Sequence, residues 1–209
     1  MGLDYSYLLY FKRDRLWDVL QAVVAISRPA EKCSQIVFPD YTLILQLQPW
    51  YQKEGTFNFN DPKFDFLVVM YFPPDREIWE YLQDVSPEYL ELWSRESPLG
   101  LPIGCIYLTV FNDLNAHEKK DWDPNLVMLE FGTTGTTMSI LFSESDSIRC
   151  RFQNLLEANH GICGILNMEN SARVIWWNGQ KVDMEISNLF PSPEEINKLL
   201  DRPSTTPGD

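Results

Sequence analysis

Apolar residues follow two periods along this 209-residue chain, one typical of helices and the other typical of strands. Between residues 14 and 26 they stand three and four positions apart, which places them on one face of a helix. Over residues 41–47 they largely alternate with polar residues, as in a half-buried strand. Residues 64–72 are almost continuously apolar, which is typical of a strand covered on both faces.

The same two patterns extend through the rest of the chain. Strands are predicted at 4–11, 35–38, 41–47, 64–72, 104–111, 126–131, 136–142, 161–168, 173–177 and 180–186. Helices are predicted at 14–26, 75–85, from 87 onward, 146–158 and 193–200.

Turn and capping residues support several of these boundaries. Asp75 stands where a helix N-cap is expected, and Ser192 followed by Pro193 and Glu195 has the spacing of a capping box. Asn178-Gly179 predicts a tight hairpin, because both central residues of that turn need a positive φ. The glycines of residues 132–135 predict a second hairpin, which would make residues 136–142 its returning strand.

Three stretches share one order of elements: a strand, a polar turn and an amphipathic helix. They are residues 10–23, 71–85 and 138–155, and the first two also share Tyr-Phe, Asp-Arg and Trp. Two interpretations are kept: an internal duplication, or the ordinary periodicity of any strand–turn–helix unit. Duplication predicts that Trp17 and Trp79 are buried in equivalent places.

These elements predict an α+β fold with a largely antiparallel or mixed sheet and helices packed on it. The repeated strand–turn–helix units suggest ferredoxin-like βαβ pieces and raise the question of an internal duplication. The length suits a single domain over residues 1–201. The polar stretch 112–125 is where two sub-domains would meet, and residues 202–209 are expected to be a disordered tail.

Composition narrows the classes of function. The net charge of −13 and the pI of about 4.5 describe an acidic surface that repels nucleic-acid backbones. No apolar run approaches the roughly 20 residues that span a bilayer, and no secretory signal is recognisable. The four cysteines lack paired spacing, and three lie in apolar runs, so buried free thiols and a cytoplasmic location are expected.

One acidic segment has the beginning of a calcium loop. Asp121, Asp123 and Asn125 match the first three ligand positions. A calcium loop then needs glycine at its sixth position and glutamate at its twelfth, where this chain has Leu126 and Gly132. We therefore expect no calcium here.

Other candidate sites also lack essential parts. His160 and Cys163 give a single close pair of zinc ligands, where zinc sites want two such pairs. The glycine-threonine run 132–137 has the glycines of a phosphate loop, but no lysine follows and strands are predicted on both sides. We expect no metal and no cofactor.

Two polar segments rich in aromatic residues are the predicted binding sites. The segment 50–60 and the segment 117–123 combine rings, which are good interface anchors, with carboxylates that would attract a basic protein partner. The candidate residues are Trp50, Tyr51, Phe57, Phe59, His117, Asp121, Trp122 and Asp123. The alternative is that these rings fold back onto the core and pin the two loops.

The sequence favours a non-enzymatic, cytoplasmic partner-binding protein, of an interaction, adaptor or immunity-like kind, with an acidic surface. The alternative is an enzyme with an unrecognised Asp/Glu acid–base site, such as a small hydrolase. A deep pocket with converging carboxylates would favour the enzyme. The sequence leaves the identity of the partner and the oligomeric state open.

Overall fold

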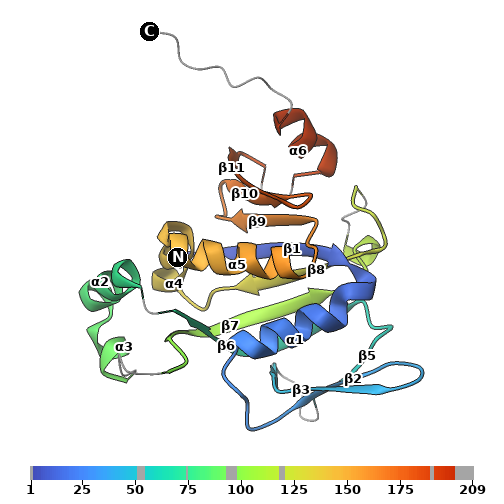
Figure 1. Ribbon diagram of the computed structural model, residues 1–209, viewed down its shortest axis with the longest axis horizontal. Helices are drawn as coiled ribbons and strands as arrows, with labels where there is room; N and C mark the ends of the chain where they lie inside the picture. The colour runs from blue at the N-terminus through green and yellow to red at the C-terminus, as the bar shows by residue number, and fades with distance from the viewer. Residues whose placement is uncertain are drawn as a thin grey trace.

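A computed structural model describes residues 2–50, 55–73, 75–92, 98–117, 121–188 and 191–200, with the side chains of residues 89, 91 and 92 left out. Within these ranges eight strands form one antiparallel sheet, in the order β11-β10-β9-β1-β8-β7-β6-β4 (Figure 1). The predicted α+β architecture with a large antiparallel sheet is thereby confirmed. The strands are β1 (Ser6–Lys12), β4 (Gln48–Pro49), β6 (Lys63–Phe72), β7 (Leu101–Phe111), β8 (Leu126–Gly132), β9 (Cys163–Asn167), β10 (Ala172–Trp177) and β11 (Gln180–Ile186).

The first layer of helices lies on the front face of this sheet. Helices α1 (Leu16–Ile26) and α5 (Asp146–Ala158) cross it side by side (Figure 1). Their apolar stripes, which include Phe152 of α5, meet strand side chains such as Phe11 and Phe131 to make the larger core. The rings of Tyr7 and Phe152 stack at 4.2 Å between centroids. Burying such rings is the main stabilising term of this layer.

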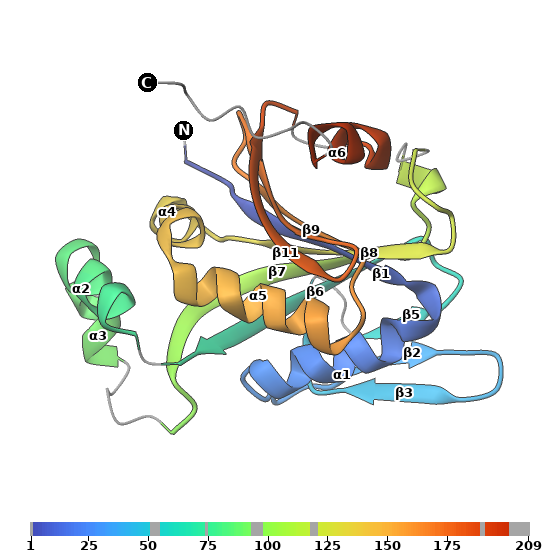
Figure 2. The ribbon, with the colours of Figure 1, turned by 45° about the horizontal axis from the view of Figure 1, so that its top comes forward.

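A second core lies on the rear face of β1, β9 and β10. Helix α6 (Pro193–Leu200) and the connection between β7 and β8, which includes the short 3-10 helix η2 (Asn115–His117), cover this part of the sheet (Figure 2). Ile196 from α6 and Trp122 from the connection are buried there against Tyr10 and Val174. Helices therefore cover parts of both faces. Because β7 and β8 pair directly, the 112–125 segment joins neighbouring strands of one sheet, and its role as a sub-domain boundary stays a prediction.

A smaller sheet lies beside β6 and α1. It contains β2 (Ser34–Val37), β3 (Thr42–Leu45) and β5 (Thr56–Asn58), in the order β3-β2-β5. The hairpin of β2 and β3 was predicted, but β5 falls in a segment predicted to be a loop and pairs with β2 in parallel. The inner face of this sheet adds Ile36, Leu43 and Phe57 to the larger core, while its outer face meets solvent.

Several predicted caps and turns are confirmed in detail. The Asp75 carboxylate accepts hydrogen bonds from the backbone N–H groups of Glu77 and Ile78, at 2.8 and 3.3 Å, and so begins α2 (Arg76–Val85). Ser192 and Glu195 form the reciprocal capping box of α6. Asn178 and Gly179 both have positive φ, at 46° and 88°. The two caps supply hydrogen-bond partners to backbone groups that lack them at a helix end, and the turn has the backbone geometry that a tight hairpin requires.

The prediction of a strand at residues 136–142 is wrong. Those residues form helix α4 (Thr136–Glu144), which leads directly into α5. Met138, Leu141 and Phe142 are buried, and their i, i+3, i+4 spacing is helical. The Ser139 hydroxyl hydrogen-bonds to Thr133 Oγ1 at 2.6 Å and to the Leu3 carbonyl at 2.6 Å, so a polar residue holds this helix in place.

The internal duplication is not confirmed. The third copy lacks its strand, because residues 138–142 are helical. Trp17 is 39% exposed, so the prediction that it is buried is wrong, while Trp79 is partly buried against the larger core. Helix α1 lies along the sheet, whereas α2 and α3 (Pro87–Leu92) lie beyond its end (Figure 1).

The prediction of buried thiols holds only for Cys163. Cys33, Cys105 and Cys150 are exposed, and none of the four cysteines is in a disulfide. Cys105 stands on the outward-pointing side of β7 and Cys150 on the outer side of α5. The apolar neighbours of a residue in a strand or helix do not decide which way that residue points.

Candidate functional site

The structure separates the predicted binding residues into buried and accessible ones. Phe57 lies in the larger core and Trp122 in the second, both at most 6% exposed. Trp50, Phe59 and His117 are partly buried, and Asp121 and Asp123 are exposed. Tyr51 lies outside the described residues. The buried rings of Phe57 and Trp122 pin their segments to the protein, whereas binding by the accessible residues stays a prediction.

The two predicted segments meet at one hollow at the end of β1. Phe59 from the first and Asp123 from the second line a cavity of about 620 Å³. The same hollow is also lined by Lys12, Arg13, Asp14, Asn125 and Leu126. Asn112, which directly follows β7, holds the end of the first segment, because its side-chain amide donates to the backbone carbonyls of Phe59 and Asp61.

Hydrogen bonds that involve Arg13 and Asp123 fix the wall of this hollow. The backbone N–H of Arg13 donates to the Asn125 carbonyl at 2.8 Å, and its guanidinium to the Pro124 carbonyl at 3.3 Å. The Asp123 carboxylate accepts the backbone N–H of Asn125 at 2.8 Å. The Asp-x-Asp-x-Asn segment thus contains a hydrogen-bonded turn, and the carbonyls of Pro124 and Asn125 already have donors.

A row of four aromatic rings runs from the hollow toward α1. Phe59 stacks on Phe38 with centroids 4.5 Å apart, and Phe38 stacks on Tyr41 at 4.4 Å. Tyr41 in turn meets the edge of Trp17 at 6.3 Å. We call Trp17, Phe38, Tyr41 and Phe59 the aromatic row. Its rings come from α1, from the turn between β2 and β3, and from the segment after β5.

Much of this aromatic row is open to solvent. Tyr41 is 52% exposed and Trp17 39%, and the adjoining hairpin strands expose Val37 and Ile44. Large apolar groups in contact with each other and with water are unusual on a monomer and mark interaction surfaces. Of the four rings, sequence reasoning selected only Phe59. The other three are Trp17 on α1 and Phe38 and Tyr41 at the turn between β2 and β3. Only folding brings them together, so no local sequence pattern links them.

The exposed residues around the aromatic row carry both signs of charge. Arg15 pairs with Asp18 at 3.1 Å, with both side chains about half exposed. Asp14, Asp40 and Asp123 are exposed, and none of them forms an ion pair within the described part of the chain. The surface near the row therefore carries unpaired carboxylates beside apolar rings.

The glycine-threonine run has a different setting from the one predicted. It joins strand β8 to helix α4, as a phosphate loop would, and does not form a hairpin. The Thr136 hydroxyl accepts the backbone N–H of Leu3 at 3.1 Å, and Thr133 Oγ1 donates to the Tyr5 carbonyl at 3.2 Å. The hydroxyl groups of Thr133 and Thr136 are therefore already engaged by the backbone of residues 3–5.

Within the described ranges, no group of three or more His, Cys, Asp or Glu side chains is placed to hold a metal ion. No helix in these ranges is long and apolar enough to cross a bilayer. No protein-family model, curated protein or solved structure significantly matches this chain.

Proposed function

We propose that this protein is a non-enzymatic binding module that binds a basic protein partner through the aromatic row. The observation that carries the proposal is the exposure of Trp17 and Tyr41, at 39% and 52%, within a continuous row of contacting rings. Trp and Tyr bury much area with few rotatable bonds, which is why they dominate interface energetics. The neighbouring hollow would accept side chains from the edge of the same partner.

The acidic surface of this protein indicates that its partner is basic. The chain carries −13 at neutral pH, and Asp14, Asp40 and Asp123 border the aromatic row and its hollow. Such a surface favours encounter with a basic protein and raises the association rate at low salt. The apolar rings would then supply the lasting contact, because rim charges contribute little to affinity once the complex has formed.

The enzyme alternative lacks a supporting feature in the described residues. Three hollows hold two carboxylates each: Glu185 with Glu195, Asp14 with Asp123, and Glu77 with Glu144. All six side chains are exposed. Exposed side chains lack the buried, enclosed surroundings in which catalytic carboxylates are usually found.

A cytoplasmic location is part of the proposal. Three of the four free cysteines are exposed. Accessible thiols persist in a reducing compartment and tend to oxidise or pair outside it.

Site-specific photo-crosslinking tests the proposal. Tyr41 is replaced by p-benzoylphenylalanine, and Val85, which is exposed at the far end of α2, is replaced in the same way as a control. The expected result is a crosslinked adduct with one partner protein from position 41, and no such adduct from position 85. Binding to the purified partner is then measured for Tyr41→Ser and Trp17→Ser, each of which should weaken it at least about tenfold.

Two results would overturn the proposal. One is an equal yield of adducts at positions 41 and 85, and the other is an unchanged dissociation constant in both serine variants. The partner should carry a basic surface, and the dissociation constant should rise with salt concentration. Tm of both variants should stay near that of the parent protein, because exposed side chains contribute little to stability.

A further inference from the structure

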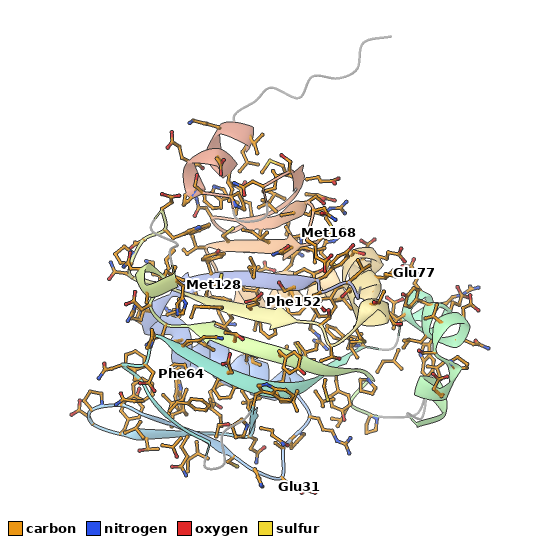
Figure 3. All side chains as sticks on the ribbon, turned by 180° about the vertical axis from the view of Figure 1, so that it is seen from behind. Glu31, Phe64, Glu77, Met128, Phe152 and Met168 are labelled. Carbon is orange, nitrogen blue, oxygen red and sulfur yellow. The ribbon has the colours of Figure 1, made fainter. Side chains whose placement is uncertain are left out.

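The rear face of the large sheet is only partly covered. Helix α6 and the 112–125 segment cover strands β1, β9 and β10, while β6, β7 and β8 run without a helix in front of them in the described residues (Figure 3). Side chains on this part of the face are intermediate in burial, among them Asp65, Leu67, Tyr107 and Thr109. An open, ordered strand face of this kind is a suitable platform for a ligand.

Strand register brings one polar group and two rings together on this platform. Asp65 pairs with Thr109 and Leu67 with Tyr107 across β6 and β7, so these side chains share one face. The backbone N–H of Trp50 donates to the Asp65 carbonyl at 3.3 Å. This bond holds the Trp50 ring against Tyr107, with centroids 4.6 Å apart and planes at 74°.

These residues enclose a pocket that is separate from the aromatic row. Its volume is about 420 Å³, and it is lined by Trp50, Lys63, Asp65, Phe66, Tyr107 and Thr109. The Thr109 hydroxyl donates to Asp65 Oδ1 at 2.9 Å, and Lys63 Nζ approaches the same oxygen at 3.3 Å. Within the described part of the chain, both contacts use Oδ1, so Oδ2 is available to an incoming donor.

The ion pair between Lys63 and Asp65 in this pocket is weak. The Lys63 and Asp65 side chains are each 42% exposed. An ion pair with this exposure contributes little to stability, because water screens the charges and holding the long lysine side chain in one geometry costs conformational entropy. A ligand with better geometry can therefore share or replace Lys63 at the carboxylate.

We infer that this pocket binds a guanidinium group. A guanidinium is planar and weakly hydrated, stacks on aromatic rings, and presents parallel N–H donors that fit a carboxylate. Here Trp50 and Tyr107 supply the ring surfaces and Asp65 supplies the acceptor, oriented by Thr109. A lysine ammonium would use the carboxylate but gain less from the rings. The inference is independent of the proposed function, since the two sites share no residue.

Binding is tested by titrating the full chain with an arginine-containing pentapeptide, Gly-Gly-Arg-Gly-Gly, and following the Trp50 indole N–H by NMR. The lysine and citrulline versions of the peptide are the comparison ligands. The arginine peptide should give saturable shifts confined to the pocket, the lysine version should bind at least about fivefold more weakly, and citrulline should not bind. Agmatine is titrated in the same way as a free guanidinium compound. If the peptide binds more tightly than agmatine, the natural ligand is an arginine side chain of a polypeptide; if agmatine binds more tightly, it is a free guanidinium compound.

Two variants with opposite expected effects make the test decisive. Asp65→Asn keeps the shape of the pocket and should weaken the arginine peptide at least about tenfold, whereas Lys63→Ala removes the competing cation and should tighten it. Asp14→Asn, in the separate hollow, should leave binding unchanged. Equal binding of arginine and lysine peptides, or weaker binding in Lys63→Ala, would overturn the inference even if Asp65→Asn fails to fold.

Discussion

The indole ring of Trp122 stacks on the phenol ring of Tyr10, with centroids 4.0 Å apart and planes within 12° of parallel. Tyr10 belongs to the central strand β1, and Trp122 belongs to the polar connection between β7 and β8. Trp177 meets the edge of the same indole at 6.2 Å. The Trp122 ring, together with the fully buried Leu114, therefore fastens the most polar stretch of the chain to the second core.

Replacing this ring should destabilise the whole domain. Trp122 is 6% exposed, and Trp122→Ala removes its packing against both neighbours. We expect a loss of about 3–5 kcal/mol in the free energy of unfolding, as for other buried aromatic residues cut to alanine. Urea unfolding followed by circular dichroism measures this. A loss below about 1 kcal/mol would mean that the connection is held mainly by Leu114 and by its hydrogen bonds.

Trp17 should behave differently from Trp122, although both residues are tryptophans. It is 39% exposed and meets the Tyr41 ring only by an edge. Trp17→Ala should therefore change the free energy of unfolding by no more than about 1 kcal/mol. The same urea titration checks it. A loss as large as that of Trp122→Ala would show that the ring supports the core and not a binding surface.

Buried tyrosines should make stability fall at high pH. Burial raises the pKa of Tyr7 and Tyr10 well above the usual 10.0 of tyrosine. Above pH 10 the unfolded chain releases these protons while the folded protein keeps them, so the folded state binds more protons and loses stability as pH rises. Each such proton contributes about 1.4 kcal/mol per pH unit.

The Tyr10→Phe variant isolates one of these protons. Its free energy of unfolding should fall less steeply between about pH 10 and 11 than that of the parent, by up to one proton's slope. Burial also raises the pKa of the Cys163 thiol, and this adds the same slope to both proteins. Urea titrations across this pH range give the two slopes. Identical slopes would mean that the Tyr10 phenol ionises in the folded protein as it does in the unfolded chain.

Local chemistry explains which parts of the fold could be predicted. Asp75 and Asn178-Gly179 act through neighbouring residues, so the sequence predicts their cap and turn directly. The parallel pairing of Thr56–Asn58 with β2 depends on chain segments far apart in sequence and leaves no local mark. Residues 136–142 have apolar positions compatible with either period, and the packing of Phe142 against Tyr7 decides for the helix.

The candidate sites were harder to predict than the elements. Phe59 and Asp123 were each selected from aromatic or acidic segments, and the structure brings them to one hollow. The other rings of the aromatic row gave no signal, because a lone Trp or Tyr in a sequence looks the same whether it is buried or exposed. The pocket near Trp50 depends on the register of β6 with β7, which alternation alone does not determine.

Gly164 allows helix α5 to approach the sheet closely. A Cβ at this position would lie 2.5 Å from Leu156 Cδ1, 3.1 Å from Ile175 Cγ1 and 3.2 Å from Trp176 Cβ. Several neighbours would have to shift at once in a packed core, so Gly164→Ala should cost about 1–3 kcal/mol in the free energy of unfolding. The residue lies on β9 opposite Trp176, beside an irregularity in β10.

Gly132→Ala is the matched control for this prediction. It lies on β8, and a Cβ there would meet only the Tyr107 carbonyl oxygen, at an ordinary 3.8 Å. The added methyl reduces the freedom of the unfolded chain, so this variant should be neutral or more stable by up to about 1 kcal/mol. Thermal and urea unfolding of both variants give the comparison. If Gly164→Ala is as stable as Gly132→Ala, then α5 is free to move away from β9, and the close contact of Leu156 with the sheet is not required for the fold.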